Sequence, residues 1–167
     1  ISCIVGKREY MKIFEDAFFS FTFAGDLSSI AAAIKVLDIL ENTDAFSRMT
    51  SAGTKLFNGA MVMAKIAGLE NNFKLDGHPH WCTFSFVDDL GREDPETKAL
   101  WLQEVTRHGV LILTTFNISA SLTYEDVEKI LLAFAHAFKV VANVKKNNYP
   151  PLKFLSGEMP VPAFKVR

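Results

Sequence analysis

The sequence predicts an α/β fold, a mixed layer structure in which short apolar strands alternate with longer helices. The first observation is the order of segments, because strand-like runs and helical patterns follow one another along all 167 residues. The second is composition, since 49% of the residues are hydrophobic and fifteen are Phe. That much apolar material is enough for a core and excludes a disordered chain.

The first part of the chain is predicted to hold two strands and two helices. Residues 1–5 are an apolar run that a glycine ends, and residues 18–23 are aromatic and lead into a glycine turn. Both patterns favour strands. Residues 8–14 are predicted as a short helix between them. Asp26 is a suitable N-cap for a helix over residues 27–37, where apolar residues recur at helical spacing.

The middle of the chain is predicted to contain a second long helix and a half-buried strand. Residues 42–44 break the preceding helix, and the next one runs over residues 46–67 until Gly68, which is a good stop signal. Residues 81–87 alternate between apolar and polar side chains. This alternation predicts a strand with one buried face, made by Cys82, Phe84 and Phe86.

The last part of the chain is predicted as helix, strand, helix and tail. Residues 95–108 begin after an Asp with Pro in the first turn and end at a glycine, which is typical of a helix. Residues 110–113 are predicted as a short buried strand. A long helix over residues 123–141 begins with a Thr and an Asp spaced almost as a capping box. The tail from Asn147 carries four of the six prolines and is expected to be an extended strap.

Charge and cysteine content exclude several classes of partner. Eighteen basic and nineteen acidic residues leave a net charge of −1, which gives no electrostatic case for nucleic acid or an anionic membrane. No apolar run approaches the length of a membrane span. Cys3 and Cys82 lie far apart and make no metal-binding spacing. We expect a reduced, cytoplasmic setting. Because no initiator Met precedes Ile1, we also expect the chain to continue a longer polypeptide.

Searches for self-contained catalytic motifs find none. The sequence has no P-loop, no G-x-G-x-x-G fingerprint and no G-x-S-x-G elbow. His78 and His80 flank a proline, and a turn is favoured over a metal site. Asp88 and Asp89 are adjacent in a polar loop, where such side chains point apart and are solvated. His108 is expected in the last turn of its helix, where a cation suits the dipole.

The segment from Phe19 to Asp26 permits two interpretations. A hydroxyl flanked by aromatic residues enters a glycine turn, and a helix is predicted directly afterwards. Such a turn can bring backbone N–H groups close to an anion, and Thr22 adds a hydroxyl donor. The alternative is a strand with a polar Thr and an Asp cap. The residues by themselves favour this alternative.

Two stretches resemble the class III pyridoxal-phosphate-dependent aminotransferases. Residues 1–11, Ile-Ser-Cys-Ile-Val-Gly-Lys-Arg-Glu-Tyr-Met, resemble the family's P-I-S-A-I-V-G-K-R-E-I-M, which follows the lysine that forms the Schiff base with the cofactor. Residues 19–33 resemble F-S-x-T-F-G-G-E-x-L-S-L-A-A-A. More loosely, residues 107–111 resemble R-x-G-V-L, and residues 119–127 resemble S-x-A-H-T-x-E-D-I with a Leu in place of the His.

The resemblance implies the type I fold of pyridoxal-phosphate-dependent transferases. Residues 1–33 would be the C-terminal remnant of the large cofactor-binding domain, and residues 34–167 the α+β small C-terminal domain. The family implies a homodimer with a shared active site. By position, the hydroxyl of Thr22 would bind the phosphate of the neighbouring subunit's cofactor, with the backbone N–H of Phe21 as a second donor. Charge-assisted hydrogen bonds of this kind are strong ones.

The function implied is amino-group transfer between a small-molecule amino donor and a carbonyl acceptor through a Schiff base. The catalytic lysine would lie upstream of Ile1, and Lys7 is not expected to replace it. No catalytic residue is therefore expected in this chain, and the fragment by itself would be inactive. Many ornithine-type members of the family carry an Arg in this region for the substrate carboxylate, whereas residues 113–118 contain none. Within the resemblance, this favours the glutamate-1-semialdehyde 2,1-aminomutase-like branch.

A second hypothesis stays open, namely a non-enzymatic interaction module that retains the small-domain fold of the aminotransferases. The decisive lysine would be absent from this chain in both cases. The sequence also leaves open the identity of the substrate, and whether the amino group is transferred or shifted within one molecule.

Overall fold

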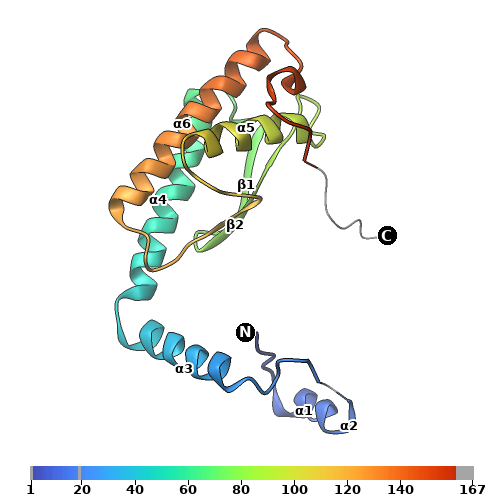
Figure 1. The fold of residues 1–167 in the computed structure, drawn as a ribbon, viewed down its shortest axis with the longest axis vertical. Coiled ribbons are helices and arrows are strands. Elements are labelled where there is room, and N and C mark those ends of the chain that lie inside the picture. The colour runs from blue at the N-terminus through green and yellow to red at the C-terminus, as the bar shows by residue number, and fades with distance from the viewer. Residues whose placement is uncertain (1, 19, 161–167) are drawn as a thin grey trace. The chain divides into compact units, whose positions relative to one another are not determined.

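The computed structural model describes residues 2–18 and 20–160 of the chain (Figure 1). The chain divides into two compact units, Ile1–Phe46 and Ser47–Arg167. No helix within the described ranges is long and apolar enough to cross a membrane. The domain boundary predicted after residue 33 stays a prediction.

The first unit consists of helices and turns. The short helix predicted over residues 8–14 is confirmed as two single-turn helices, α1 (Arg8–Met11) and α2 (Ile13–Asp16). The next predicted helix is confirmed as α3 (Leu27–Asn42). Asp26 caps α3 as expected, because its side chain accepts a hydrogen bond of 2.9 Å from the backbone N–H of Ser29.

The two strands predicted in this unit are wrong. Residues 2–5 are irregular and exposed, and residue 1 lies outside the described residues. Residues 20–25 form irregular chain and a turn, while Phe19 lies outside the described residues. Hydrogen bonds of the backbone N–H groups of Ala24 and Asp26 to the carbonyl oxygens of Phe21 and Phe23 close successive turns. An apolar run predicts burial, whereas a strand also needs a pairing partner.

The first unit has almost no interior of its own. Among its described residues only Ala45 is buried. Large apolar side chains of α3 are exposed, including Leu27, Ile34 and Leu37. Burial of apolar surface must offset the conformational entropy lost on folding. The stability of this unit therefore requires cover from other surfaces.

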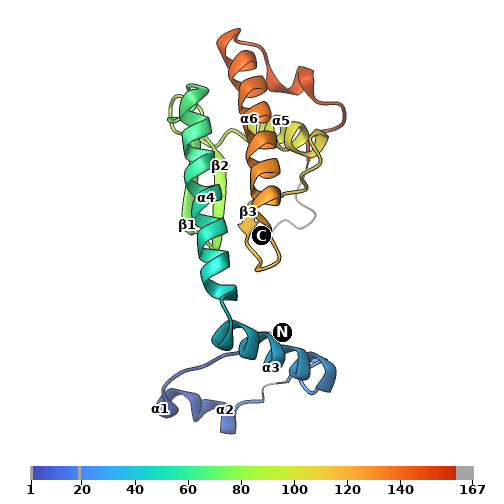
Figure 2. The ribbon, with the colours of Figure 1, turned by 90° about the vertical axis from the view of Figure 1, so that its left-hand side faces the viewer.

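The second unit is an α+β layer structure built on a three-stranded antiparallel sheet (Figures 1 and 2). Its strands are β1 (Phe73–His78), β2 (Trp81–Phe86) and β3 (Thr115–Asn117), paired in that order. Its helices are α4 (Ala45–Ile66), which begins at the end of the first unit, α5 (Pro95–Arg107), α6 (Tyr124–Lys146) and the 3-10 helix η1 (Pro151–Phe154). In Figure 2, α5 packs against α6.

Most of the elements predicted in this unit are confirmed. Strand β2 has the predicted alternation, with Cys82, Phe84 and Phe86 buried. Helix α5 begins at the predicted Asp cap and Pro, and α6 begins with a complete capping box. After α4, the backbone N–H groups of Gly68 and Leu69 bond back to the carbonyl oxygens of Lys65 and Ala64. This Schellman arrangement uses a positive φ of 72° at Gly68.

Two strand assignments in the second unit differ from expectation. The sequence did not predict β1, because its residues, Phe-Lys-Leu-Asp-Gly-His, lose their alternation after the third position. The strand predicted over residues 110–113 is wrong. That segment belongs to no strand, and the pairing with β2 is made by residues 115–117 instead.

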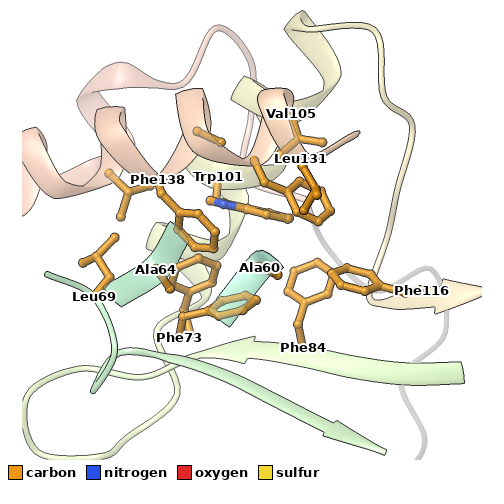
Figure 3. Packing of buried hydrophobic residues seen from close by; sticks show 14 of the residues in the cluster. Ala60, Ala64, Leu69, Phe73, Phe84, Trp101, Val105, Phe116, Leu131 and Phe138 are labelled. Carbon is orange, nitrogen blue, oxygen red and sulfur yellow. The ribbon is translucent and has the colours of Figure 1, made fainter. Parts of the chain in front are cut away.

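The core of the second unit is a cluster of aromatic rings around Trp101 of α5 (Figure 3). The indole lies with ring centroids 4.9 Å from Phe84 of β2 and 5.5 Å from Phe138 of α6. Phe73 of β1 meets Phe138 edge to face, with centroids 4.9 Å apart. These offset and edge-on contacts are favourable beyond the area buried. The sheet and two helices are therefore joined through one set of rings.

The tail after α6 carries one short 3-10 helix and is held against α5. The side-chain amide of Gln103 donates to the carbonyl oxygen of Phe154 at 3.0 Å, and its oxygen accepts from the backbone N–H of Ser156 at 2.6 Å. The guanidinium of Arg107 donates to the hydroxyl of Ser156 and pairs with Glu104 at 2.6 Å. The tail is thus held at the backbone carbonyl of Phe154 and the backbone N–H of Ser156. The prediction of an extended tail is wrong over Pro151–Phe154, which form η1.

Candidate functional site

The two residues predicted to bind phosphate lie in the turn that precedes α3. Thr22 and Phe21 are both exposed, and Thr22 is the first residue of the turn over residues 22–25. Within the described part of the chain, no hydrogen bond of the Thr22 hydroxyl is found. Among these residues, the hydroxyl would break no bond when it donates to an incoming anion.

The N-terminus of α3 is capped by the carboxylate of Asp26. The carboxylate of Asp26 accepts hydrogen bonds from the hydroxyls of Ser28 and Ser29, in addition to the Ser29 N–H. These bonds, chiefly the one from the Ser29 hydroxyl, hold the pKa of Asp26 below its ordinary value. The helix end is thus already capped. A phosphate in this region would rely on the Thr22 hydroxyl rather than on the dipole of α3.

The turn offers a hydrogen-bond donor to a phosphate group, but the nearby carboxylate of Asp26 restricts where the phosphate can bind. The exposed hydroxyl of Thr22 supplies a donor suited to phosphate oxygens. The carboxylate of Asp26, four residues further on, is ionised and would repel a second anion placed against it. The fit is therefore to a phosphate that approaches on the Thr22 side of the turn. The backbone N–H of Phe21 as second donor stays a prediction.

The histidines lie in the hairpin between β1 and β2 and on the facing helices α5 and α6. His78 ends β1, and His80 lies in the hairpin turn, with the two rings edge to face and 4.7 Å apart. The Nε2 atom of His80 lies 2.6 Å from the hydroxyl of Thr50 on α4. His108 caps α5 and stacks on His136 of α6 with centroids 4.4 Å apart. Among the described residues, no group of three or more His, Cys, Asp or Glu could hold a metal ion.

The aspartates of the polar loop serve to hold the chain in place. Asp88 accepts hydrogen bonds from the backbone N–H groups of Leu90 and Arg92, and its side chain pairs with that of Arg92 at 2.6 Å. Asp89 pairs with Lys145 of α6 and accepts from Asn72 at 3.1 Å. These bonds lower the pKa of both carboxyls, for Asp88 chiefly the one from Arg92 and for Asp89 the one from Lys145. A carboxylate fixed in this way is a poor proton carrier.

Sequence reasoning missed a hollow of about 400 Å3 beside β3, which we call the β3 hollow. Its floor is made of buried core residues, and residues 110–113 together with β3 form its wall. The floor residues are Leu56, Phe116, Ile118 and Phe134. The sequence carries no signal for the hollow, because the apolar residues 110–113 were predicted to be a short buried strand.

Comparisons with known proteins find a relative in sequence and two solved structures with a similar fold. No protein-family model matches the chain. Over 113 residues the chain is 28% identical to the 3-aminobutyryl-CoA aminotransferase of Cloacimonas acidaminovorans (strain Evry). The aligned residues make up 67% of this chain and 27% of that protein. The fold matches the FumI protein of Sphingopyxis sp. MTA144, solved in its PLP internal aldimine form, with a TM-score of 0.73 and 24% identity over 90% of this chain.

A second solved structure has the same fold. It is an (S)-enantioselective omega-transaminase from Thermomicrobium roseum, which matches with a TM-score of 0.61 and 17% identity over 80% of this chain. The chain is therefore similar in sequence to part of one aminotransferase, and it shares the fold of part of these two solved structures. In this chain the fold includes an α+β unit around a three-stranded antiparallel sheet.

The chain spans only part of the length of these three proteins. It covers 27% of the relative from Cloacimonas, 36% of FumI and 32% of the omega-transaminase. The comparisons therefore show the fold and a similarity in sequence to part of one aminotransferase. The activity of a whole enzyme does not follow from it directly.

Proposed function

We propose that this chain is the C-terminal part of a pyridoxal-phosphate-dependent aminotransferase or aminomutase. In that protein, residues 1–33 end the large cofactor domain and residues 34–167 form the small domain. The enzyme moves an amino group from a small-molecule amino donor to a carbonyl acceptor. The catalytic lysine lies upstream of Ile1, and the fragment without it is inactive. The similarity in sequence to an aminotransferase and the shared fold of the two solved structures support this proposal.

The residue of this chain that carries the proposal is Thr22. When bound, pyridoxal phosphate supplies the electron sink for chemistry at the amine-bearing carbon. Thr22 donates its hydroxyl hydrogen to the cofactor phosphate of the partner subunit and so fixes the cofactor's orientation. The observation behind this role is the exposure of a hydroxyl that has no bond within the described residues, in the segment that resembles the family's phosphate-binding block.

The first unit also gives support to the proposal. Its described residues bury only Ala45, and its apolar side chains are exposed on α3 and the turns before it. A segment of this kind needs a larger surface to cover it. A large cofactor domain and a partner subunit would supply that surface. The branch close to glutamate-1-semialdehyde 2,1-aminomutase is proposed because residues 113–118 offer no Arg to a substrate carboxylate.

The test uses the natural polypeptide that contains this chain together with its cofactor domain. Thr22→Ala removes one charge-assisted hydrogen bond, worth about 1.5–3 kcal/mol, so the affinity for pyridoxal phosphate should fall by roughly 10- to 100-fold. Thr22→Ser should restore most of it, and Ser20→Ala, which removes a nearby hydroxyl, serves as the matched control. Titration of the cofactor into the apo forms gives these affinities.

Two further outcomes decide the remaining parts of the proposal. If Thr22 acts on the partner's cofactor, retention of the cofactor should fall as the protein is diluted through its dimer dissociation range. Equal affinities of the wild type and Thr22→Ala would remove Thr22 from the site. A polypeptide that binds no pyridoxal phosphate at all would favour the interaction module with a retained small-domain fold.

A further inference from the structure

Asp26 differs from three other aspartates of the chain in the groups that hold its carboxylate. The other three each form an ion pair with a Lys or an Arg, namely Asp38, Asp88 and Asp89. Asp26 accepts hydrogen bonds from uncharged donors, which are the hydroxyls of Ser28 and Ser29 and the backbone N–H of Ser29. Within the described residues no cationic side chain pairs with it. The turn before α3 therefore carries a negative charge that no side chain neutralises.

The turn that leads into α3 brings this charge close to Thr22. The backbone N–H of Asp26 donates to the carbonyl oxygen of Phe23 at 3.1 Å. A turn closed by such a bond holds its first and fourth Cα atoms within about 7 Å, and neighbouring Cα atoms are about 3.8 Å apart. The Cα atoms of Thr22 and Asp26 are therefore separated by no more than about 11 Å. The Debye length is about 10 Å at 0.1 M salt, so a phosphate bound at Thr22 would still be repelled by the carboxylate.

Asp26 also occupies the helix end that would otherwise attract a phosphate. The N-terminus of a helix carries about half a positive charge and unpaired N–H groups, and it is a common place for phosphate to bind. In α3 the backbone N–H of Ser29 is already bonded to the Asp26 carboxylate at 2.9 Å. The repulsion and the occupied helix end act in the same direction, because both lower the affinity of this turn for a phosphate.

We propose that Asp26 weakens the phosphate contact at Thr22 through its charge and so limits the affinity for the cofactor. This inference rests on the proposed function, because it needs a cofactor phosphate at Thr22. A phosphate ester carries a charge of about −1.5 to −2 at pH 7. At about 10 Å and 0.1 M salt, with a dielectric constant between those of water and a protein surface, one carboxylate should lower the affinity for such a group by about threefold.

The test introduces Asp26→Asn into the natural polypeptide that contains this chain together with its cofactor domain. Asn caps helices about as well as Asp, so the variant loses the charge and keeps the start of α3. Titration into the apo form should show that the variant binds pyridoxal phosphate about threefold more tightly than the wild type at about 0.1 M salt. The gain should shrink at about 1 M salt, where the charges are screened. Pyridoxal, which has the same ring and aldehyde but no phosphate, should bind equally to both forms.

Two further variants separate the charge of Asp26 from other effects of its replacement. Asp38→Asn is the matched control, because it removes a carboxylate from the same helix about 18 Å further along its axis. At about 0.1 M salt charges this far apart are largely screened, so Asp38→Asn should leave the affinity for pyridoxal phosphate unchanged. Asp26→Ser also keeps a cap without a charge, and it should reproduce the gain seen for Asp26→Asn.

Three results would overturn the proposal. They are an unchanged or weaker affinity of Asp26→Asn for pyridoxal phosphate, an equal gain for pyridoxal, and an equal gain in Asp38→Asn. Thr22→Ala, measured alongside, separates this inference from the proposed function. If Thr22→Ala weakens cofactor binding and Asp26→Asn has no effect, Thr22 stays in the site and the role given to Asp26 is wrong. If Thr22→Ala has no effect, the contact at Thr22 fails and this inference fails with it.

Discussion

Gly53 is the position at which a single methyl group should disturb the second unit most. It is buried on α4 and faces the hairpin turn between β1 and β2. A Cβ atom added there would lie 2.2 Å from the carbonyl oxygen and 2.8 Å from the carbonyl carbon of Pro79. Ordinary carbon–oxygen contacts are about 3.3–3.6 Å. Helix and turn would have to separate by about 1.2 Å to relieve the closest contact.

Gly53→Ala should therefore lower the free energy of unfolding in spite of a better helix propensity. Replacing Gly by Ala in a helix interior gains about 1 kcal/mol. Overpacking in a core costs about 1–3 kcal/mol, and occasionally more. The clashing atom belongs to the backbone of a tight turn and has little room to give, which favours the upper end of that range. The expected net loss is about 2 kcal/mol.

Urea unfolding of the chain, followed by the fluorescence of its tryptophans, measures this loss. Gly59→Ala is the matched variant on the same helix, where the added Cβ would lie 2.5 Å from the Cδ2 atom of Leu131. A leucine side chain can move aside, so the loss there should be below about 1 kcal/mol. Thr54→Ala, at an exposed position of α4, should stabilise by a few tenths of a kcal/mol. If Gly53→Ala proves as stable as the wild type, or no worse than Gly59→Ala, the close approach inferred for α4 and the Pro79 turn is wrong.

Two other substitutions test the core and the last helix. Trp101 is fully buried, and its indole N–H has no hydrogen-bond partner within the described residues. Trp101→Phe should therefore cost less than about 2 kcal/mol in urea unfolding, against about 3–5 kcal/mol for Trp101→Ala; equal losses would mean that the indole N–H is bonded. The pKa of Asp126 is lowered below its usual 3.8, chiefly by the backbone N–H of Thr123. A carboxyl with a depressed folded pKa stabilises above its unfolded value and loses that effect as the pH falls through the folded one. Asp126→Asn should thus lower the unfolding temperature at about pH 7 and leave it unchanged near pH 2, and a difference that persists in acid would contradict the capping role.

Local signals predicted the elements whose ends the sequence itself marks. Asp26, Asp94 and Thr123 each cap the helix that was expected to follow them, and Gly68 ends α4 with a positive φ. Caps and stops of this kind depend on side chains within a few residues, so they can be read locally.

Strands were harder to predict, because pairing depends on residues far away in the sequence. Residues 110–113 are four consecutive apolar residues, the pattern of a short buried strand, yet β2 pairs with residues 115–117 instead. Residues 20–25 include the end of a predicted aromatic strand, but they close into turns through their own backbone hydrogen bonds. In both cases the residue types favoured a strand but left its pairing partner undetermined.

The candidate site was only partly accessible to sequence reasoning. The segment around Thr22 could be found because a resemblance marks it, and the structure adds that the hydroxyl is exposed on a turn. The β3 hollow had no such signal. It exists because Leu56 of α4 and Phe134 of α6, distant in the chain, meet beside an extended segment that no strand covers.

The amino-acid sequence by itself determined the helices with their caps, the buried face of β2 and the abundance of aromatic residues in the core. These features follow from residue type and from spacing over a few turns. Tertiary structure alone decided which segments pair into the sheet, how closely α4 approaches the Pro79 turn, and where a hollow without charge remains. Those features are set by contacts between segments tens of residues apart, and the spacing of residues within one segment carries no information about them.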